Sequence, residues 1–234
     1  MRTRDRVSIG WADPGHVDGE FAVNIALLST ARMSVLGPLI RVEGSALISR
    51  IRNEIVQTFL DKTDSAWLLM IDSDEVLTVQ AFDKLIATAH DKTHPIVAGL
   101  YFGAFSQEDS AYPVPVPLIY RAKEHGYLPV DDYPQDKVIS IDAAGTGCLL
   151  IHRSVLEAIR ATATVDQGPN WCWFQDEPIG GHWVGEDLMF CRKAIAAGFP
   201  IHAHTGAVLP HRKRFWLTDR HHSIDRRARA AAQN

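Results

Sequence analysis

Apolar runs and amphipathic stretches alternate along this chain, a pattern typical of α/β proteins. Trp67–Ile71 is an unbroken run of five apolar residues, and residues 95–102 form another largely apolar run. Runs this short predict strands that are covered on both faces, as in parallel sheets. Residues 79–90, between these runs, carry apolar side chains at helical spacing, which predicts a helix with one face on the core. We therefore expect a mixed, mostly parallel central sheet flanked by helices.

The same patterns predict the remaining elements. Further strands are expected at residues 7–11, 138–142, 148–152, 200–204 and 207–211, the last two at sheet edges, and further helices at residues 21–30, 43–62, 155–161 and 188–197. Residues 103–136 are rich in proline, which is confined to edge strands, and we interpret them as an insertion beside the site. Residues 162–182 contain the aromatic cluster 171–174 and predict an exposed binding lid, because long loops in compact domains tend to be lids.

The composition is that of a globular protein with a sizeable core. The chain has 234 residues, of which 46% are hydrophobic and 22% charged, which suits one large α/β domain. The net charge of −4 argues against nucleic-acid binding by the whole surface. Basic residues nevertheless outnumber acidic ones after position 211. The basic residues there are Arg212, Lys213, Arg214, Arg220, Arg226, Arg227 and Arg229. We expect a solvated tail there, with contact to an anionic partner as the alternative.

The cysteines and the N-terminal residues predict a cytoplasmic protein. Cys148, Cys172 and Cys191 are odd in number and lack metal-type spacing, so we expect free thiols in a reducing compartment. No apolar signal core follows the basic start, and no run reaches the roughly 18 apolar residues that span a bilayer. We therefore expect no stable membrane insertion.

The strongest candidate for chemistry follows the buried strand expected at Trp67–Ile71. Asp72 and Asp74 lie two residues apart, so in extended geometry both carboxylates point to the same side. Ligands of open α/β sheets bind beyond the strand ends. The pair therefore predicts a divalent-metal site whose shell is completed by substrate phosphates. The alternative is a solvated turn or a helix N-terminal cap, where carboxylates are also favoured.

Three other features accompany this acidic motif. The Gly-Thr-Gly motif at 145–147 lies between two apolar strands and marks a bend or a close approach of the backbone to a ligand. The Gly-Glu-Asp motif at 185–187 opens a predicted helix, and a histidine ends a late strand. A metal held by Asp and His, with another carboxylate nearby, suits two chemistries: transfer from a nucleotide-diphospho compound, and metal-assisted hydrolysis.

Taken in order, these motifs resemble those of GT-A-fold glycosyltransferases of the family-2-like group, especially the compact members of actinobacteria and their phages. The order is a strand with Asp-x-Asp, then Gly-Thr-Gly-Cys-Leu-Leu-Ile, then Gly-Glu-Asp-Leu-x-Phe-Cys-x-x-Ala-x-x-Ala-Gly, then Leu-x-His. The run Ile51-Arg-Asn-Glu-Ile-Val56 is also similar to the Arg-Asn helix that precedes the acidic strand in that group. The resemblance extends from residue 7 to residue 211.

The resemblance implies a domain division and a metal site. Residues 1–215 would form a single GT-A-type domain with the nucleotide-diphospho-sugar transferase fold, and residues 216–234 would form a basic tail. Mn²⁺ or Mg²⁺ would be bound by Asp72, Asp74 and His211. His202 and His204 compete with His211 for the last position, since they lie two apart on a strand and face one way.

The resemblance also implies roles around the substrates. Asp187 would deprotonate the acceptor hydroxyl, with Glu186 as its substitute. The residues expected around the donor are Ala12, Asp13 and Pro14 at the base and ribose, Arg52, Asn53, Asp72 and Ser73 beside them, Gly145, Thr146 and Gly147 at the sugar, and Trp183 towards the acceptor.

The implied activity is hexosyl transfer, with inversion, from a UDP- or GDP-linked sugar to a hydroxyl acceptor. Glycan, small molecule, lipid carrier, protein side chain and modified DNA all remain open as acceptors, and a phage-encoded enzyme would act in the cytoplasm of its bacterial host. The Asp-Pro-Gly run at 13–15 departs from the Pro-x-x-Asn run usual in the group. Two alternatives stay open. One is a nucleotidyltransferase on a related sheet, although residues 12–15 lack the basic, Gly-rich loop of that class, and the other is a nucleotide-sugar-binding module without catalysis.

Overall fold

The fold is built on a central sheet of seven strands. A computed structural model describes residues 6–44, 47–107, 110, 112–124, 126–162 and 172–231. The strand order is β2 (Leu36–Glu43), β1 (Val7–Asp13), β3 (Trp67–Ile71), β11 (Cys148–His152), β4 (Ile96–Leu100), β14 (Ile201–Val208) and β9 (Val138–Ile141). β1 is parallel to β2 and β3, and β4 is parallel to β14, whereas β11 and β9 run antiparallel to their neighbours. The mixed, mostly parallel sheet expected from the sequence is confirmed.

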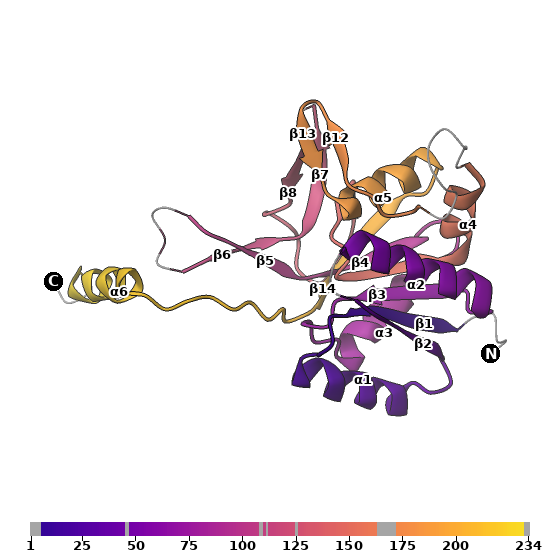
Figure 1. Ribbon diagram of the computed structural model, residues 1–234, viewed down its shortest axis with the longest axis horizontal. Coiled ribbons are helices and arrows are strands. Elements are labelled where there is room, and N and C mark those ends of the chain that lie inside the picture. The colour runs from indigo at the N-terminus through magenta and orange to yellow at the C-terminus, as the bar shows by residue number, and fades with distance from the viewer. Residues whose placement is uncertain are drawn as a thin grey trace.

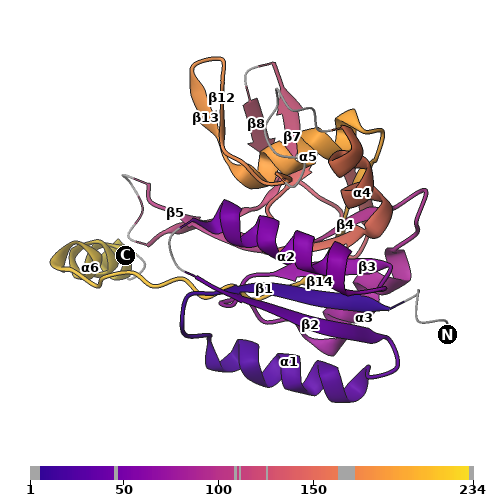
Figure 2. The same cartoon turned by 45° about the vertical axis from the view of Figure 1, so that its right-hand side comes forward.

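Helices cover both faces of this sheet (Figure 2). α1 (Gly19–Ala31) and α3 (Val79–Thr88) lie on one face, and α2 (Ile48–Lys62), α4 (Arg153–Thr162) and α5 (Glu186–Ala196) lie on the other. Each layer has its own cluster of buried apolar side chains, and the central strands contribute to both. This is why β3 is apolar throughout, since a strand covered on both faces has no solvated side.

Short antiparallel pairs and a C-terminal arm project from the sheet (Figure 1). β5 (Phe102–Phe105) pairs with β6 (Val114–Pro117), β7 (Ile119–Lys123) pairs with β8 (Gly126–Pro129) and β10 (Ala143–Ala144), and β12 (Glu177–Ile179) pairs with β13 (His182–Val184). The proline-rich insertion expected at residues 103–136 thus includes short strands. An extended segment after residue 211 leads to α6 (Asp219–Ala231), which lies away from the sheet.

Two predictions of secondary structure were wrong. The helix expected at residues 43–62 begins only at Ile48, because the strand β2, which was not predicted, occupies Leu36–Glu43. The edge strands expected at residues 200–204 and 207–211 are a single strand, β14, which lies inside the sheet between β4 and β9.

The aromatic residues of the predicted lid belong to the core. Trp173 and Phe174 are fully buried, and Trp171 lies outside the described residues. Asn53 of α2 binds this segment: its Oδ1 accepts the backbone N–H groups of Trp173 and Phe174 at 2.8 and 2.9 Å, and its Nδ2 donates to the Phe174 carbonyl at 2.7 Å. An exposed lid is therefore wrong for these residues, because α2 anchors them.

The cysteines are free thiols, as predicted, and Cys148 and Cys191 are buried among apolar side chains. Among the described helices, none combines the length and the apolar character needed to cross a bilayer.

Candidate active site

The acidic motif lies where β3 leaves the sheet. β1 and β3 are parallel neighbours, so their carboxyl ends meet at one edge, where α/β sheets bind ligands. Asp72 donates its backbone N–H to the Gly147 carbonyl at 3.0 Å, and the Asp74 carbonyl accepts the N–H of Arg212 at 2.9 Å. These two bonds hold the acidic turn between the Gly-Thr-Gly bend and the segment that follows β14.

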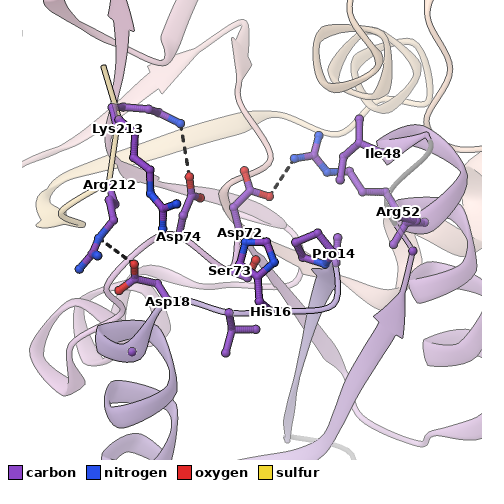
Figure 3. Close-up of a pocket in the computed structure, with 16 residues that line it drawn as sticks. Pro14, His16, Asp18, Ile48, Arg52, Asp72, Ser73, Asp74, Arg212 and Lys213 are labelled. Carbon is purple, nitrogen blue, oxygen red and sulfur yellow. Dashed lines mark hydrogen bonds and ion pairs between the residues drawn. The ribbon is translucent and has the colours of Figure 1, made fainter. Parts of the chain in front are cut away.

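A cavity of about 610 Å³ opens beside this turn (Figure 3). Segments far apart in the sequence line it: the loop from β1 into α1, one side of α2, the acidic turn, and the residues after β14. The lining residues are Ala12, Pro14, His16, Val17, Asp18, Gly19, Gly44, Ile48, Ile51, Arg52, Asp72, Ser73, Asp74, Arg212, Lys213 and Arg214. Its volume is within the range of small-molecule and cofactor sites.

Asp74 lines this cavity and is in contact with His211, which precedes the lining residue Arg212. His211 Nε2 lies 3.3 Å from Asp74 Oδ2, and the imidazole is almost buried while the carboxylate is half-exposed. Burial alone would raise the pKa of Asp74, but the hydrogen bond from His211 and the charges of His211 and Lys213 outweigh it, so the pKa lies below the usual value. Asp74 is therefore held as a carboxylate, the form that binds metal ions.

The other nitrogen of His211 fixes the orientation of its ring. Nδ1 lies 2.9 Å from the carbonyl oxygen of Phe102, and because a carbonyl only accepts, Nδ1 carries the proton. Nε2 therefore faces Asp74, and it is the ring atom that would bind a metal ion held between the two residues. Metal-binding histidines are commonly oriented in this way by a backbone carbonyl behind the ring.

Arg52 links the acidic turn to the helix that carries the predicted base. Its guanidinium donates to Asp72 Oδ1 at 3.0 Å and forms a second ion pair with Glu186. Burial would lower the pKa of Arg52, but the two carboxylates outweigh it and raise the pKa. A buried arginine that bridges α2, the acidic turn and α5 sets the spacing between the predicted metal site and the predicted base.

Asp187 and Glu186 begin α5 side by side, in different surroundings. Glu186 is ion-paired with Arg52, whereas among the described residues no cation pairs with Asp187, whose Oδ1 accepts the Leu188 N–H at 2.7 Å. Burial raises the pKa of both carboxyl groups, against the lowering effect of Arg52. A carboxylate with a raised pKa and no ion pair is better suited to accept a proton than its neighbour.

Glu75 directly follows the acidic motif and is completely buried. Neither carboxylate oxygen has a hydrogen-bond partner among the described residues. Burial, with the charges of Asp72 and Asp74, raises its pKa well above the usual value. A Cβ on Gly147 would collide with its Oε1, so this position needs glycine because the backbone passes directly against the Glu75 side chain.

The rest of the Gly-Thr-Gly bend is also buried. The N–H of Gly147 donates to the Tyr101 hydroxyl at 2.9 Å, and the N–H of Gly145 donates to the Leu118 carbonyl at 2.9 Å. Thr146 borders the same small void as Asp72, and its Oγ1 has no partner among the described residues. The bend therefore supports the acidic turn from behind.

Several predicted site residues do not face the cavity with their functional groups. The Asp13 carboxylate pairs with Arg41 and accepts the Gly15 N–H at 2.8 Å, which stabilises the turn after β1. The amide of Asn53 is engaged by the 172–174 segment, as described above. Trp183 stands on β13 with 76% of its surface exposed.

The competing histidines have other contacts. His202 packs its ring against His94 at 4.3 Å between centroids, and His204 Nδ1 accepts the Gly206 N–H at 3.0 Å. Both lie within β14, whereas His211 follows its end. Of the three, His211 is the one in contact with Asp74.

Asp74 and His211 offer one carboxylate oxygen and one imidazole nitrogen; the oxygen is the donor that Mn²⁺ and Mg²⁺ prefer, and the nitrogen is a donor for transition metals. Within the part of the chain that the structure describes, no three His, Cys, Asp or Glu side chains converge into a complete metal cluster. A metal ion on this pair would take its remaining ligands from substrate and water, as Mg²⁺ commonly does when it is bound with phosphates.

Comparison with known proteins establishes the fold. No protein-family model and no curated protein matches the sequence. Among solved structures, A197 from STIV is similar with a TM-score of 0.53 and 17% identity, covering 85% of this chain and 81% of that one. GalNAc-T7 with UDP, GalNAc and Mn²⁺ is similar with a TM-score of 0.54 and 12% identity, covering 92% of this chain but 45% of that one. This chain therefore has the GT-A fold of glycosyltransferases, and it spans less than half of GalNAc-T7.

Proposed function

We propose that this protein is a metal-dependent glycosyltransferase that moves a hexose from a UDP- or GDP-linked donor to a hydroxyl acceptor. The observation that carries the proposal is the contact between Asp74, which lines the cavity of about 610 Å³ at the carboxyl edge of the sheet, and His211, whose ring is oriented by the Phe102 carbonyl. The motif order also supports a place in the family-2-like group. The GalNAc-T7 structure, of the same fold, is described with UDP, GalNAc and Mn²⁺.

In this proposal Asp74 and His211 hold Mn²⁺ or Mg²⁺, and Asp72 lies near the ribose and the donor sugar with its carboxylate oriented by Arg52. The bound metal would neutralise the negative charge that develops on the departing diphosphate. Ala12, Pro14 and Ser73 line the donor cavity. Asp13 contributes indirectly, through the turn that it stabilises with Gly15.

Asp187 is the proposed general base of an inverting transfer. The acceptor oxygen forms a bond to the anomeric carbon, the bond from that carbon to the diphosphate oxygen breaks, and the hydroxyl proton passes to Asp187. Glu186 is the weaker candidate, because its charge is already engaged by Arg52. Trp183, exposed on β13, is available to contact an acceptor.

The test is a thermal-shift panel of nucleoside diphosphates and nucleotide sugars, each with and without MnCl₂. A ligand that binds only the folded state raises the melting temperature by mass action. We expect one diphosphate to raise it, a larger shift with manganese, and loss of the manganese effect in Asp74→Asn. Asp132→Asn makes the same change at an exposed site and should behave as wild type. A panel without any shift, from folded protein, would contradict the proposal.

A further inference from the structure

The three residues that follow His211 run along the wall of the donor cavity. We call Arg212, Lys213 and Arg214 the cationic strap, and all three line the cavity. Figure 3 labels Arg212 and Lys213. Arg212 Nε lies 2.7 Å from Asp18 Oδ2, and the Asp18 side chain is only 8% exposed. The backbone N–H of Arg212 also donates to the Asp74 carbonyl. The hydrogen bond and the ion pair together hold the strap beside the acidic turn.

Lys213 shares an oxygen with the proposed metal site. Its Nζ lies 3.5 Å from Asp74 Oδ2, the same atom that His211 Nε2 approaches at 3.3 Å. A divalent cation bound between Asp74 and His211 would take that oxygen and repel the ammonium group. The Lys213 side chain is 41% exposed, and its long flexible stem lets it move away without disturbing the backbone.

The charges around the cavity indicate where Lys213 would go. Three carboxylates line it, on Asp18, Asp72 and Asp74, and four cationic side chains do, on Arg52 and the cationic strap. Arg52 is engaged by Asp72, and Arg212 by Asp18. A metal on Asp74 would therefore take the carboxylate that pairs with Lys213. The Lys213 and Arg214 side chains line the cavity and would then be the cations available to a diphosphate bound there.

We propose that Lys213 is a diphosphate-binding residue that exchanges partners. It pairs with Asp74 until a divalent metal takes that carboxylate, and it then pairs with the diphosphate of the donor while Arg212 stays on Asp18. This inference rests on the proposed function. It assigns the first residues of the basic tail to the donor, because the strap lies on the donor cavity and lines it together with Asp72 and Asp74.

The exchange predicts that Lys213→Ala changes the affinities for manganese and for nucleoside diphosphate in opposite directions. Isothermal titration calorimetry measures both affinities. Without nucleotide, MnCl₂ should bind roughly two- to fivefold more tightly than to wild type, because an exposed competing charge is gone. With saturating manganese, UDP or GDP should bind roughly tenfold more weakly, because a charge-assisted contact is lost. Lys213→Arg should restore most of the diphosphate affinity. Arg226→Ala removes the same charge from an exposed position on α6 and should change neither constant.

The outcomes separate the two claims. If wild type binds neither diphosphate with manganese, the proposed function fails and the inference fails with it. If wild type binds one of them and Lys213→Ala binds it equally well, the proposed function stands and the role of Lys213 is overturned. Weaker manganese binding in Lys213→Ala would also overturn the exchange, since competition for Asp74 requires the opposite change.

Discussion

Burial raises the pKa of both carboxyl groups at the start of α5. The pKa of Asp187 is raised by burial, with opposing contributions from Arg52 and the Leu188 N–H. Burial also raises the pKa of Glu186, although this carboxylate is ion-paired with Arg52. At this scale, the local environment distinguishes two adjacent acids that a motif presents as equivalent, and it leaves Asp187 as the group able to accept a proton.

We predict that Asp187→Asn strongly lowers kcat while raising stability at neutral pH. Loss of a general base costs roughly 10²–10⁴-fold in kcat. The folded-state pKa of Asp187 exceeds the usual 3.8. Between these two values the folded state binds more protons than the unfolded state, so wild-type stability falls as pH rises through that window. Asparagine does not ionise and avoids this loss.

The measurement is chemical denaturation and kcat/KM across pH 4 to 8. Wild-type kcat/KM should fall as the pH drops through the raised pKa, because the base becomes protonated. Glu186→Gln serves as the comparison, and if it lost more activity than Asp187→Asn, the two roles would have to be exchanged.

At the scale of elements, α2 holds two adjacent polar residues with different tasks. Arg52 reaches the acidic turn and α5, whereas Asn53 reaches the backbone of Trp173 and Phe174. Neighbours on a helix point about 100° apart, so one helix can support the site on one side and hold a loop on the other. Asn53 therefore supports the structure of the domain, and its amide is not free to bind nucleotide.

We predict that Asn53→Ala lowers the free energy of unfolding by roughly 2–4 kcal/mol, because it removes buried hydrogen bonds and strands two backbone N–H groups. The affinity for nucleoside diphosphate should stay unchanged in the folded variant. Urea denaturation and calorimetry measure the two quantities. Glu54→Ala, at the next and exposed position of α2, should leave both unchanged, and a selective loss of nucleotide affinity in Asn53→Ala would contradict this assignment.

The pattern of apolar and polar residues predicted correctly the strands that are buried along almost their whole length. The bounds of β3 and β11 follow directly from apolar runs. β2 was missed because its burial alternates and it contains Pro38, a residue tolerated there because β2 is a sheet edge. β14 was divided in two because its polar positions and Gly206 interrupt the apolar pattern of a strand that lies in the sheet interior.

At the scale of the whole molecule, strand order assembles the site. Asp72 and Asp74 could be found from sequence because a local motif carries them, but Arg52 pairs with a residue 134 positions away. No local pattern encodes such a contact, since it depends on which strands are neighbours. The three basic residues after Leu-Pro-His, at positions 212–214, could have indicated the cationic strap, but from the sequence they were grouped with the solvated tail. The GT-A fold is confirmed, whereas the closeness to actinobacterial and phage members stays a prediction.

The measurement that tests the central claim most directly is release of nucleoside diphosphate from UDP- and GDP-linked hexoses, with and without MnCl₂. Glycosyl transfer to an acceptor or to water releases the same diphosphate, so the assay does not require the natural acceptor. We predict manganese-dependent release from one donor class by wild type, and a loss of at least roughly 10²-fold in folded Asp74→Asn, as expected when a group that stabilises transition-state charge is removed. Equal release by Asp74→Asn and wild type would contradict the assignment of this carboxylate to the metal.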